Sequence, residues 1–463
     1  MKFKGIRIGH SRESDEVLRY KGPGHLITVS PSRMGKGRDA LIPALLEWPY
    51  SCVVVDPKAE LSCVTSKQRA RYGKVIYLDP FRLVARYMGK AARASRYNPM
   101  ARLDPDSIEF GAQAEKIADA LIWRESDGGE NFFTGGAGGM CSTIEMGLAR
   151  HAEPQDKTLL ALRSVITGEF QGGVDIFGFA RAIMQHSTDR VLRQRVARYT
   201  VPGAEQSRSL ADIIQTADGQ TRFLSDYALA ESLSGSDFSF ADLKKQVVTV
   251  YVVLPTDYLD VCGKYFRLIV ASALSELLAG KRGVPTLILM DEFFQLGSLK
   301  AIENAMGMAA GYGVQLWPVL QDLSQLSGLY PQTWETFLSN AGVRMFFSPR
   351  DEKTSDYLSG QCGRTERRSI SKSISYQDEM ERQAQLGQLG QGSAGYSMNV
   401  ANVNLSFGSV ARELLLPHET RELDDDEMLL FVERVKGVIR ARRRAYWDEP
   451  DLRGQYQPNP YFE

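Results

Sequence analysis

The chain of 463 residues is long enough for two or three domains and a large buried core. Hydrophobic residues make up 43% of it and charged residues 24%, and its 56 basic residues are balanced by 56 acidic ones. This composition excludes a disordered or fibrous chain, and it leaves any contact with nucleic acid or an anionic membrane to a local patch.

The sequence also limits the compartment in which the protein works. It contains no run of about 18 apolar residues, and its amino terminus, MKFKGIR, lacks the apolar core of a signal peptide, so we expect a cytosolic protein. The five cysteines are scattered without C-x-x-C spacing, and the five histidines do not cluster with them. This pattern favours reduced, buried thiols over disulfides or a zinc site.

The first third of the chain alternates short β-branched runs with helix-like periodicity. Strands are predicted at residues 25–29, 52–56 and 75–78, and helices at residues 38–47 and 60–71. This alternation predicts a parallel sheet with crossover helices.

From about residue 107 the pattern becomes helical. Segments 108–122, 142–150 and 181–213 carry apolar residues three and four apart without β-rich runs, which predicts an inserted all-α domain. The glycine-rich stretch at residues 127–136 is predicted to be a surface loop, and its paired aromatics offer a point of contact.

The strand pattern returns in the second half of the chain and completes one α/β fold with a doubly wound, mostly parallel sheet. Near its end, residues 364–410 are polar and repetitive, which predicts either an exposed excursion or a mobile loop. We therefore predict residues 1–106 and 241–463 as two parts of one nucleotide-binding domain, interrupted by the all-α domain at 107–240. The predicted strands of the second half are 247–254, 286–290, 315–320, 343–347, 428–433 and 438–442, and the predicted helices are 263–278, 299–310 and 353–361.

A loop that follows the first predicted strand has the composition of a phosphate-binding loop. Its residues are Ser30, Pro31, Ser32, Arg33, Met34, Gly35, Lys36 and Gly37. In such a loop the backbone N–H groups cradle phosphates and the lysine, here Lys36, reaches the β and γ oxygens. Two positions depart from the usual G-x-x-x-x-G-K-[ST], because Ser30 replaces the first glycine and Gly37 replaces the hydroxyl residue. The alternative is an ordinary turn with a solvated lysine.

A second segment supplies the carboxylates that such a site needs. Residues 287–290 are apolar and are followed by Asp291 and Glu292, which predicts a buried strand that delivers Asp291 to Mg²⁺ and Glu292 to an attacking water. For Glu292 the alternative is an acid that caps the next turn. Both signals in this order predict a nucleoside triphosphatase that binds ATP and Mg²⁺. Since Gly37 lacks a hydroxyl, we expect a water or another carboxylate to complete the Mg²⁺ shell.

Several longer blocks resemble one family. The segment LILMDEFFQLG at 287–297, with GYGV at 311–314 and QDLSQL at 321–326, resembles the type IV secretion coupling proteins, the TraG- and TraD-like conjugation ATPases. The resemblance spans nearly the whole chain, and the family's loop commonly carries glycine after the lysine. Further similar blocks are DPKAE at 56–60, YNPM at 97–100 and RELLLPHE at 412–419.

The resemblance implies a RecA-like P-loop motor domain with an all-α domain, assembled as a homo-hexamer at the cytoplasmic face of a type IV secretion channel. It implies that ATP hydrolysis drives or gates the transfer of single-stranded DNA with its relaxase, or of protein effectors. Most members carry two amino-terminal transmembrane helices. This chain begins close to its first motor strand, so we expect either a soluble variant, peripheral at the inner membrane through a separate membrane-anchor protein, or a truncated chain.

The resemblance also suggests roles for residues outside the two motifs. Gln321 resembles the polar residue that senses the γ phosphate, and Arg344 or Arg350 is the candidate cation donated across a subunit interface. Asp56 and Lys58 are predicted to form a supporting ion pair or to contact phosphate. For DNA contact the candidates, each of which is otherwise a solvated face, are the basic clusters at 244–245, 281–282, 367–368 and 440–444.

Two other functions stay open on sequence alone. One is an FtsK-like double-stranded DNA translocase, which shares the D-P-K strand end and the Asp-Glu strand. The other is a nucleotide-binding effector receptor without motor activity, which the substitution at Ser30 permits. The GYG and QDLSQL blocks favour the coupling family.

Overall fold

The computed structural model describes residues 3–89, 92–123, 132–378 and 399–461. The chain divides into two compact units, one made of Met1–Thr354 with Leu423–Glu463 and the other of Ser355–Glu422. Among the described residues, no helix is both long enough and apolar enough to cross a lipid bilayer. The five cysteines are buried free thiols, as predicted.

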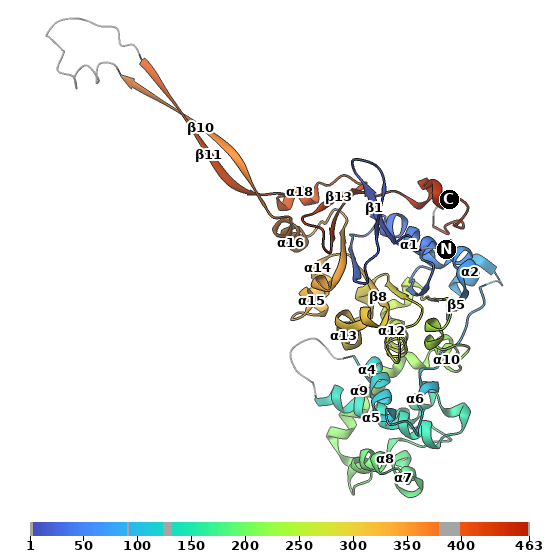
Figure 1. Cartoon of the computed structure of the whole chain (residues 1–463). Coiled ribbons are helices and arrows are strands. Elements are labelled where there is room, and N and C mark those ends of the chain that lie inside the picture. The colour runs from blue at the N-terminus through green and yellow to red at the C-terminus, as the bar shows by residue number, and fades with distance from the viewer. Residues whose placement is uncertain (1–2, 90–91, 124–131, 379–398, 462–463) are drawn as a thin grey trace, which may run out of the picture. The chain divides into compact units, whose positions relative to one another are not determined.

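The larger unit is built around an 11-stranded sheet (Figure 1), whose strand order is β2-β1-β13-β12-β9-β3-β8-β7-β4-β6-β5. From β5 to β9 all neighbouring strands are parallel, and from β9 through β12, β13 and β1 to β2 they are antiparallel. The strands are β1 (Ile6–Ser11), β2 (Val17–Tyr20), β3 (His25–Val29), β4 (Ser51–Val55), β5 (Lys74–Leu78), β6 (Val248–Val252), β7 (Thr286–Met290), β8 (Val314–Leu320), β9 (Ala341–Phe346), β12 (Glu427–Val432) and β13 (Ile439–Arg442).

Burial explains why the parallel strands were predictable. Every residue of β3, β4, β6, β7 and β8 is buried, as expected for parallel strands covered by helices on both faces. Such strands are continuous apolar runs, and these runs are the signal on which the prediction rested. The helices that connect and cover the strands include α1 (Ile42–Glu47), α2 (Glu60–Tyr72), α3 (Leu83–Met88), α12 (Lys264–Leu277), α13 (Lys300–Met308), α14 (Leu323–Leu329) and α15 (Trp334–Ser339).

Strands β1 and β2 were not predicted. In β1 the polar residues Arg7 and His10 are buried, because Arg7 pairs with Glu47 at 3.0 Å and with Glu449 at 2.7 Å, and His10 lies 2.5 Å from Glu449. Ion pairs allow charged residues inside the fold, so the apolar alternation that signals a strand is missing here.

Between residues 110 and 244 the described chain is almost entirely helical, which agrees with the all-α character expected there. The predicted boundaries at 106/107 and 240/241 stay a prediction. The longer helices are α4 (Phe110–Leu121), α5 (Phe132–His151), α6 (Leu159–Thr167), α7 (Ile176–His186), α8 (Arg190–Val196), α9 (Arg208–Thr221) and α10 (Tyr227–Leu233).

The predicted glycine-rich loop at 127–136 is wrong in its second part. Residues 132–136 form the first turns of α5, and residues 127–131 lie outside the described residues. The glycines serve close helix packing, because a Cβ added at Gly136 would come within 2.7 Å of Ile213 on α9. The exposed Phe132 packs edge-on against Phe133 with 5.5 Å between ring centroids, and a contact role for the pair stays a prediction.

The described residues of the smaller unit contradict one of the two alternatives predicted at 364–410, the mobile loop. Strands β10 (Arg364–Asp378) and β11 (Asn399–Glu413) form a two-stranded antiparallel ribbon (Figure 1), paired from Arg364↔Glu413 to Asp378↔Asn399. The alternation of serine with isoleucine at 369–375 has the period of two that is typical of a strand, although its polarity suggested low complexity. Residues 379–398 lie outside the described residues. Helices α16 (Glu352–Cys362) and α18 (Pro417–Arg421) flank the ribbon in the sequence.

Candidate functional site

The predicted phosphate loop is a tight turn between β3 and a short helical segment, Gly37–Leu41, that leads into α1. At its start the Ser30 N–H donates to the carbonyl of Leu320 at the end of β8, over 2.8 Å. Arg33 and Gly35 have left-handed backbones, with φ of 66° and 80°. A glycine is needed at residue 35, because a Cβ there would lie 2.8 Å from Asp39 Oδ2.

Lys36 joins the loop to the two predicted carboxylates. Its Nζ lies 2.9 Å from Asp291 Oδ1 and 2.8 Å from Glu292 Oε1, just beyond the end of β7. Gln321, which follows β8, donates from Nε2 to Glu292 Oε2 over 3.2 Å. The structure therefore brings together four residues that the sequence placed in the site.

The charges in this cluster stabilise one another. Burial disfavours the charged form of Lys36, but the negative charges of Asp291 and Glu292 and its hydrogen bonds to them outweigh burial and raise its pKa. Burial likewise works against ionised Glu292, but Lys36 and the hydrogen bond from Gln321 lower its pKa overall. Lys36 and Glu292 are therefore both ionised at neutral pH.

Asp56, at the end of β4, caps α2. Its carboxylate accepts hydrogen bonds from the N–H groups of Leu61 at 3.3 Å and Ser62 at 2.7 Å. Burial raises the pKa of Asp56 to about 7, despite those hydrogen bonds. The positive charge of Lys58 acts on Glu292, whose pKa it helps to lower, which is a different supporting role from the predicted pair with Asp56.

Arg443 contacts the phosphate loop and the segment after it through hydrogen bonds to Met34 and Asp39. This contact was not predicted from the sequence. The buried guanidinium donates from Nη1 to the carbonyl of Met34 and to Asp39 Oδ2 at 2.9 Å, and from Nε to the carbonyl of Glu427 at 3.1 Å. It also lies 4.4 Å from the centroid of the Phe347 ring. In a planar trans peptide the carbonyl of Met34 and the N–H of Gly35 point in opposite directions. The contact with Arg443 therefore turns the Gly35 N–H away from Arg443.

Two of the predicted DNA-contact clusters contain side chains that are paired with other groups of the same chain. Within 440–444, Arg440 Nε lies 2.6 Å from Glu427, and Arg444 Nη2 lies 2.6 Å from Asp15, in addition to the contacts of Arg443. Lys244 donates to the carbonyls of Leu277 and Ala279 at 3.0 and 2.9 Å. The side chains of residues 367–368 lie outside what the structure describes. A DNA-binding role for any of these clusters stays a prediction.

The two candidate arginines lie in different places. Arg344, inside β9, has its guanidinium 4.9 Å from the centroid of the Phe431 ring and is directed to that ring rather than to Lys36. Arg350 is exposed, and its Nη2 lies 3.5 Å from the Met34 sulfur in the phosphate loop. Arg350 is therefore the candidate that the structure brings to the loop, and action across a subunit interface stays a prediction for both.

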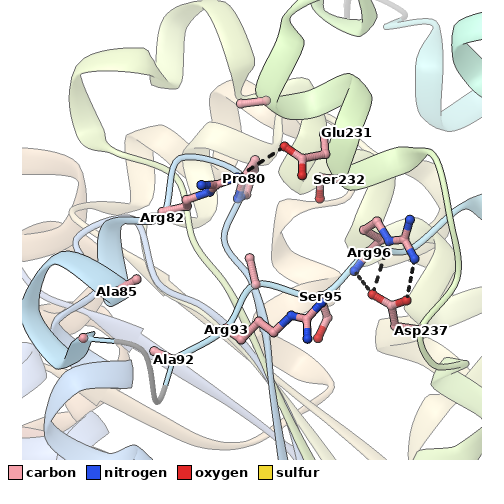
Figure 2. A pocket seen from close by; sticks show the side chains of 13 residues that line it. Pro80, Arg82, Ala85, Ala92, Arg93, Ser95, Arg96, Glu231, Ser232 and Asp237 are labelled. Carbon is pink, nitrogen blue, oxygen red and sulfur yellow. Dashed lines mark hydrogen bonds and ion pairs between the residues drawn. The ribbon is translucent and has the colours of Figure 1, made fainter.

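A cavity of about 1090 Å³ lies beyond the end of β5 (Figure 2), and none of the predicted nucleotide-site residues is among its lining residues. Arg82 pairs there with Glu231 at 3.6 Å, and Arg96 pairs with Asp237 at 3.0 Å. Arg93 also lines the cavity, and its charge helps to lower the pKa of Asp237 after the larger effect of the hydrogen bonds from Arg96. The walls thus carry charges of both signs, and none of these charged residues belongs to the Lys36 cluster.

Comparison with known proteins gives one consistent result. The family model described as "Type IV secretory system Conjugative DNA transfer" matches residues 6–461. Protein VirD4 of Agrobacterium fabrum is 28% identical over 451 residues, which cover 94% of this chain and 60% of that protein. Conjugal transfer protein TraG of Escherichia coli is 25% identical over 453 residues, which cover 90% of this chain and 65% of that protein. The chain thus spans less than two thirds of the length of these relatives.

Solved structures agree on the fold. Bacterial conjugative coupling protein TrwBdeltaN70, in its trigonal form with sulphate, has a TM-score of 0.64 at 15% identity, over 96% of this chain and 95% of that chain. Plasmid coupling protein TrwB in complex with ADP and Mg²⁺ has a TM-score of 0.61 at 15% identity, over 91% and 86%. The likeness confirms the predicted RecA-like fold with its mostly parallel sheet.

Proposed function

Because the chain belongs to the Type IV secretory system Conjugative DNA transfer family, we propose that it is an ATP-hydrolysing coupling protein. It recruits a relaxase-bound single DNA strand or effector proteins to a type IV secretion channel and drives or gates their transfer. The observation that carries the proposal is the contact of Lys36 with both Asp291 and Glu292, beside Gln321. The TrwB complex with ADP and Mg²⁺ supports the choice of ligands.

The nucleotide site works through the residues already brought together. The β and γ phosphates draw Lys36 away from the carboxylates, while the N–H groups of Met34, Gly35, Lys36 and Gly37 and the following helical segment hold the phosphate oxygens. Asp291 would hold Mg²⁺, which prefers oxygen ligands and when bound would neutralise charge on the phosphates.

Glu292 is the base that orients and deprotonates the attacking water. In the present geometry Lys36 lowers the pKa of Glu292. When Lys36 moves to the phosphates, Glu292 loses that neighbour and becomes a stronger base at the moment a water must be activated. Gln321 hydrogen-bonds Glu292 and so links the γ-phosphate position to the end of β8.

Assembly and location follow from the same proposal. Six copies form a ring at the cytoplasmic face of the inner membrane, held there by channel components or a separate anchor protein. Arg350, beside Met34, or Arg344 completes the site of a neighbouring subunit. A subunit-mixing experiment tests which arginine acts. If Arg350 or Arg344 acts on a neighbouring subunit, its alanine variant mixed with wild-type protein should lower ATP hydrolysis by more than the fraction of variant subunits in the mixture.

An ATPase assay tests the function at saturating Mg²⁺, with single-stranded DNA, with double-stranded DNA and without DNA. We expect hydrolysis that single-stranded DNA stimulates, and the Lys36→Ala protein gives the background. Stimulation by double-stranded DNA alone would favour an FtsK-like translocase. Nucleotide binding without any hydrolysis would favour an effector receptor and overturn the motor.

A further inference from the structure

Gly37 stands where a phosphate loop usually carries the serine or threonine whose hydroxyl binds Mg²⁺. A Cβ added to Gly37 would have the carboxylate of Glu60 as its nearest neighbour, with Oε2 at 3.6 Å and Oε1 at 3.8 Å. The Glu60 carboxylate therefore lies beside the space in which the missing hydroxyl would sit.

The surroundings of Glu60 hold its carboxylate in that direction. Glu60 is the first residue of α2 and follows Ala59, whose backbone is left-handed with φ of 57°. Asn459, in the carboxyl-terminal segment, donates from Nδ2 to Glu60 Oε1 over 2.8 Å. Tyr461 hydrogen-bonds the carbonyl of Lys58 over 2.7 Å and fixes the same turn. One carboxylate oxygen is thus held by an amide, and the other is the atom nearest to Gly37.

Glu60 and Asp291 belong to the same edge of the sheet. Strands β4 and β7 are parallel neighbours, and the Asp291 N–H donates to the carbonyl of Val55 over 3.3 Å. After the dominant effect of burial, the charges of Glu60 and Asp291 both contribute to the raised pKa of Asp56. Both carboxylates therefore lie within electrostatic reach of one residue.

This donor set fits a metal that arrives with its nucleotide. Mg²⁺ is usually held by one or two protein carboxylates together with substrate phosphates and waters, rather than by a complete protein cage. Within the described part of the chain no group of three or more His, Cys, Asp or Glu side chains is placed to hold a metal. The arrangement around Gly37 therefore suits a nucleotide-bound Mg²⁺ and not a resident structural ion.

We propose that Glu60 is the protein ligand that replaces the hydroxyl missing at Gly37 in the shell of the nucleotide's Mg²⁺. The proposal rests on the proposed function, since the nucleotide phosphates supply the other oxygens. It gives a role to Glu60, the last residue of the DPKAE block. Asp291 and Glu60 then share the metal from two neighbouring strand ends.

Calorimetric titration with ADP, in EDTA and in excess Mg²⁺, separates metal binding from nucleotide binding in the full chain. For Glu60→Gln we expect ADP affinity in EDTA within about twofold of wild type, and a Mg²⁺ affinity of the ADP complex that falls about 10- to 100-fold. Asn459→Ala keeps the carboxylate and loses only its clamp, so its Mg²⁺ affinity falls less. Glu335→Gln, on α15, is the matched control and changes neither value.

Rescue gives the sharpest result. Gly37 has an ordinary φ, and a Cβ there meets only contacts of 3.6 Å or more, so serine fits. Combining Gly37→Ser with Glu60→Gln should restore most of the Mg²⁺ affinity that Glu60→Gln alone loses. Electron paramagnetic resonance should likewise show that the double variant again binds Mn²⁺ together with ADP.

Three outcomes overturn this assignment: Glu60→Gln with wild-type Mg²⁺ affinity, Glu60→Gln with weak ADP binding in EDTA, or failure of the serine to rescue. The proposed function fails separately, if the wild-type chain binds no ADP under either condition.

Discussion

The two halves of the 11-stranded sheet contribute different things to the site. The parallel half, from β5 to β9, ends in the groups for which we propose chemical roles, since Lys36 follows β3 and the two carboxylates follow β7. The antiparallel half, from β12 to β2, contributes Arg443, which holds the backbone of the loop at Met34. The carboxylates after β7 and Arg443 after β13 therefore approach the loop from opposite sides of β3. A substitution in either half of the sheet can disable the loop.

The antiparallel half is itself held by buried charges. Arg7 is almost fully buried and pairs with Glu47, Glu449 and Asp451 at 2.6–3.0 Å. A buried ion pair adds stability mainly while it is complete, because removing one partner leaves an uncompensated charge. This half is therefore sensitive to single charge deletions, whereas the apolar parallel strands are sensitive to lost volume.

Removing the lysine should have the largest effect on the parallel half. Lys36→Ala deletes the cation that meets the phosphates and leaves Asp291 and Glu292 without their counter-ion. We expect ATP hydrolysis to fall by at least about 10²–10³-fold. Steady-state phosphate release measures it, with Lys67→Ala on the exposed face of α2 as the control. Turnover within tenfold of wild type would remove Lys36 from the site.

Glu292→Gln should separate binding from chemistry in the same half. The amide cannot accept a proton from water, so we expect single-turnover hydrolysis to fall about 10²–10⁴-fold while ATP still binds. A filter or fluorescence binding assay on the same preparation supplies the second measurement. If hydrolysis were unchanged, the residue would be the turn-capping acid that the sequence left as an alternative.

Arg443→Gln tests the contribution of the antiparallel half. It removes one of the two guanidinium partners of the buried Asp39, which keeps Arg38, and it frees the Met34 carbonyl, so we expect a loss of about 1–3 kcal/mol in unfolding free energy. We also expect ADP affinity to fall at least about tenfold, because the loop N–H groups are no longer held in place.

Arg444→Gln is the matched control for this variant, since Arg444 pairs with Asp15 at the surface, where ion pairs add little to stability. Denaturant titration and calorimetry report the two quantities. A lowered stability with unchanged ADP affinity would show that Arg443 stabilises the fold without acting on the loop.

The smallest expected effect lies outside both halves, at Glu145 on α5. Burial raises the pKa of this carboxyl well above its usual value, and the charges of Glu115 and Asp119 raise it further. The carboxyl of Glu145 thus stays protonated in the folded state, whereas in the unfolded chain it loses its proton at about pH 4.3. The free energy of unfolding is therefore highest below that pH, with respect to this group, and falls as the pH rises toward the pKa of the folded state.

Glu145→Gln should remove this slope and leave hydrolysis unchanged. Melting temperatures measured from pH 5 to pH 8 test it, and the variant should lose less stability over that range than wild type. Parallel curves for the two proteins would contradict a raised pKa at Glu145.

How far the sequence predicts this molecule depends on where the signal lies. The buried runs predicted β3 and β7 with the bounds that the structure has, because no acidic residue, lysine or arginine interrupts them. In β1, Arg7 and His10 hide the strand, since their partner Glu449 is far away in the sequence. In β10, the polar residues that alternate along the strand pointed to an exposed excursion or a mobile loop instead of a strand.

The site divides in the same way. Lys36, Asp291, Glu292 and Gln321 follow strand ends, where a parallel sheet collects functional side chains, so their meeting could be foreseen. Arg443 and Glu60 depend on contacts between distant segments, with Met34 and Asn459, that have no local pattern. For Glu60 the sequence offered two indirect signals, the DPKAE block at 56–60 and the missing hydroxyl at Gly37.

The double contact of Lys36 has a consequence for the order in which ligands arrive. The Lys36 ammonium pairs with both Asp291 and Glu292 and so neutralises negative charge where a cation would bind. Free Mg²⁺ must displace that ammonium to enter, whereas a magnesium–nucleotide complex offers the lysine new anions in exchange. We therefore expect the site of Asp291 and Glu292 to bind Mg²⁺ together with a nucleotide and not Mg²⁺ alone.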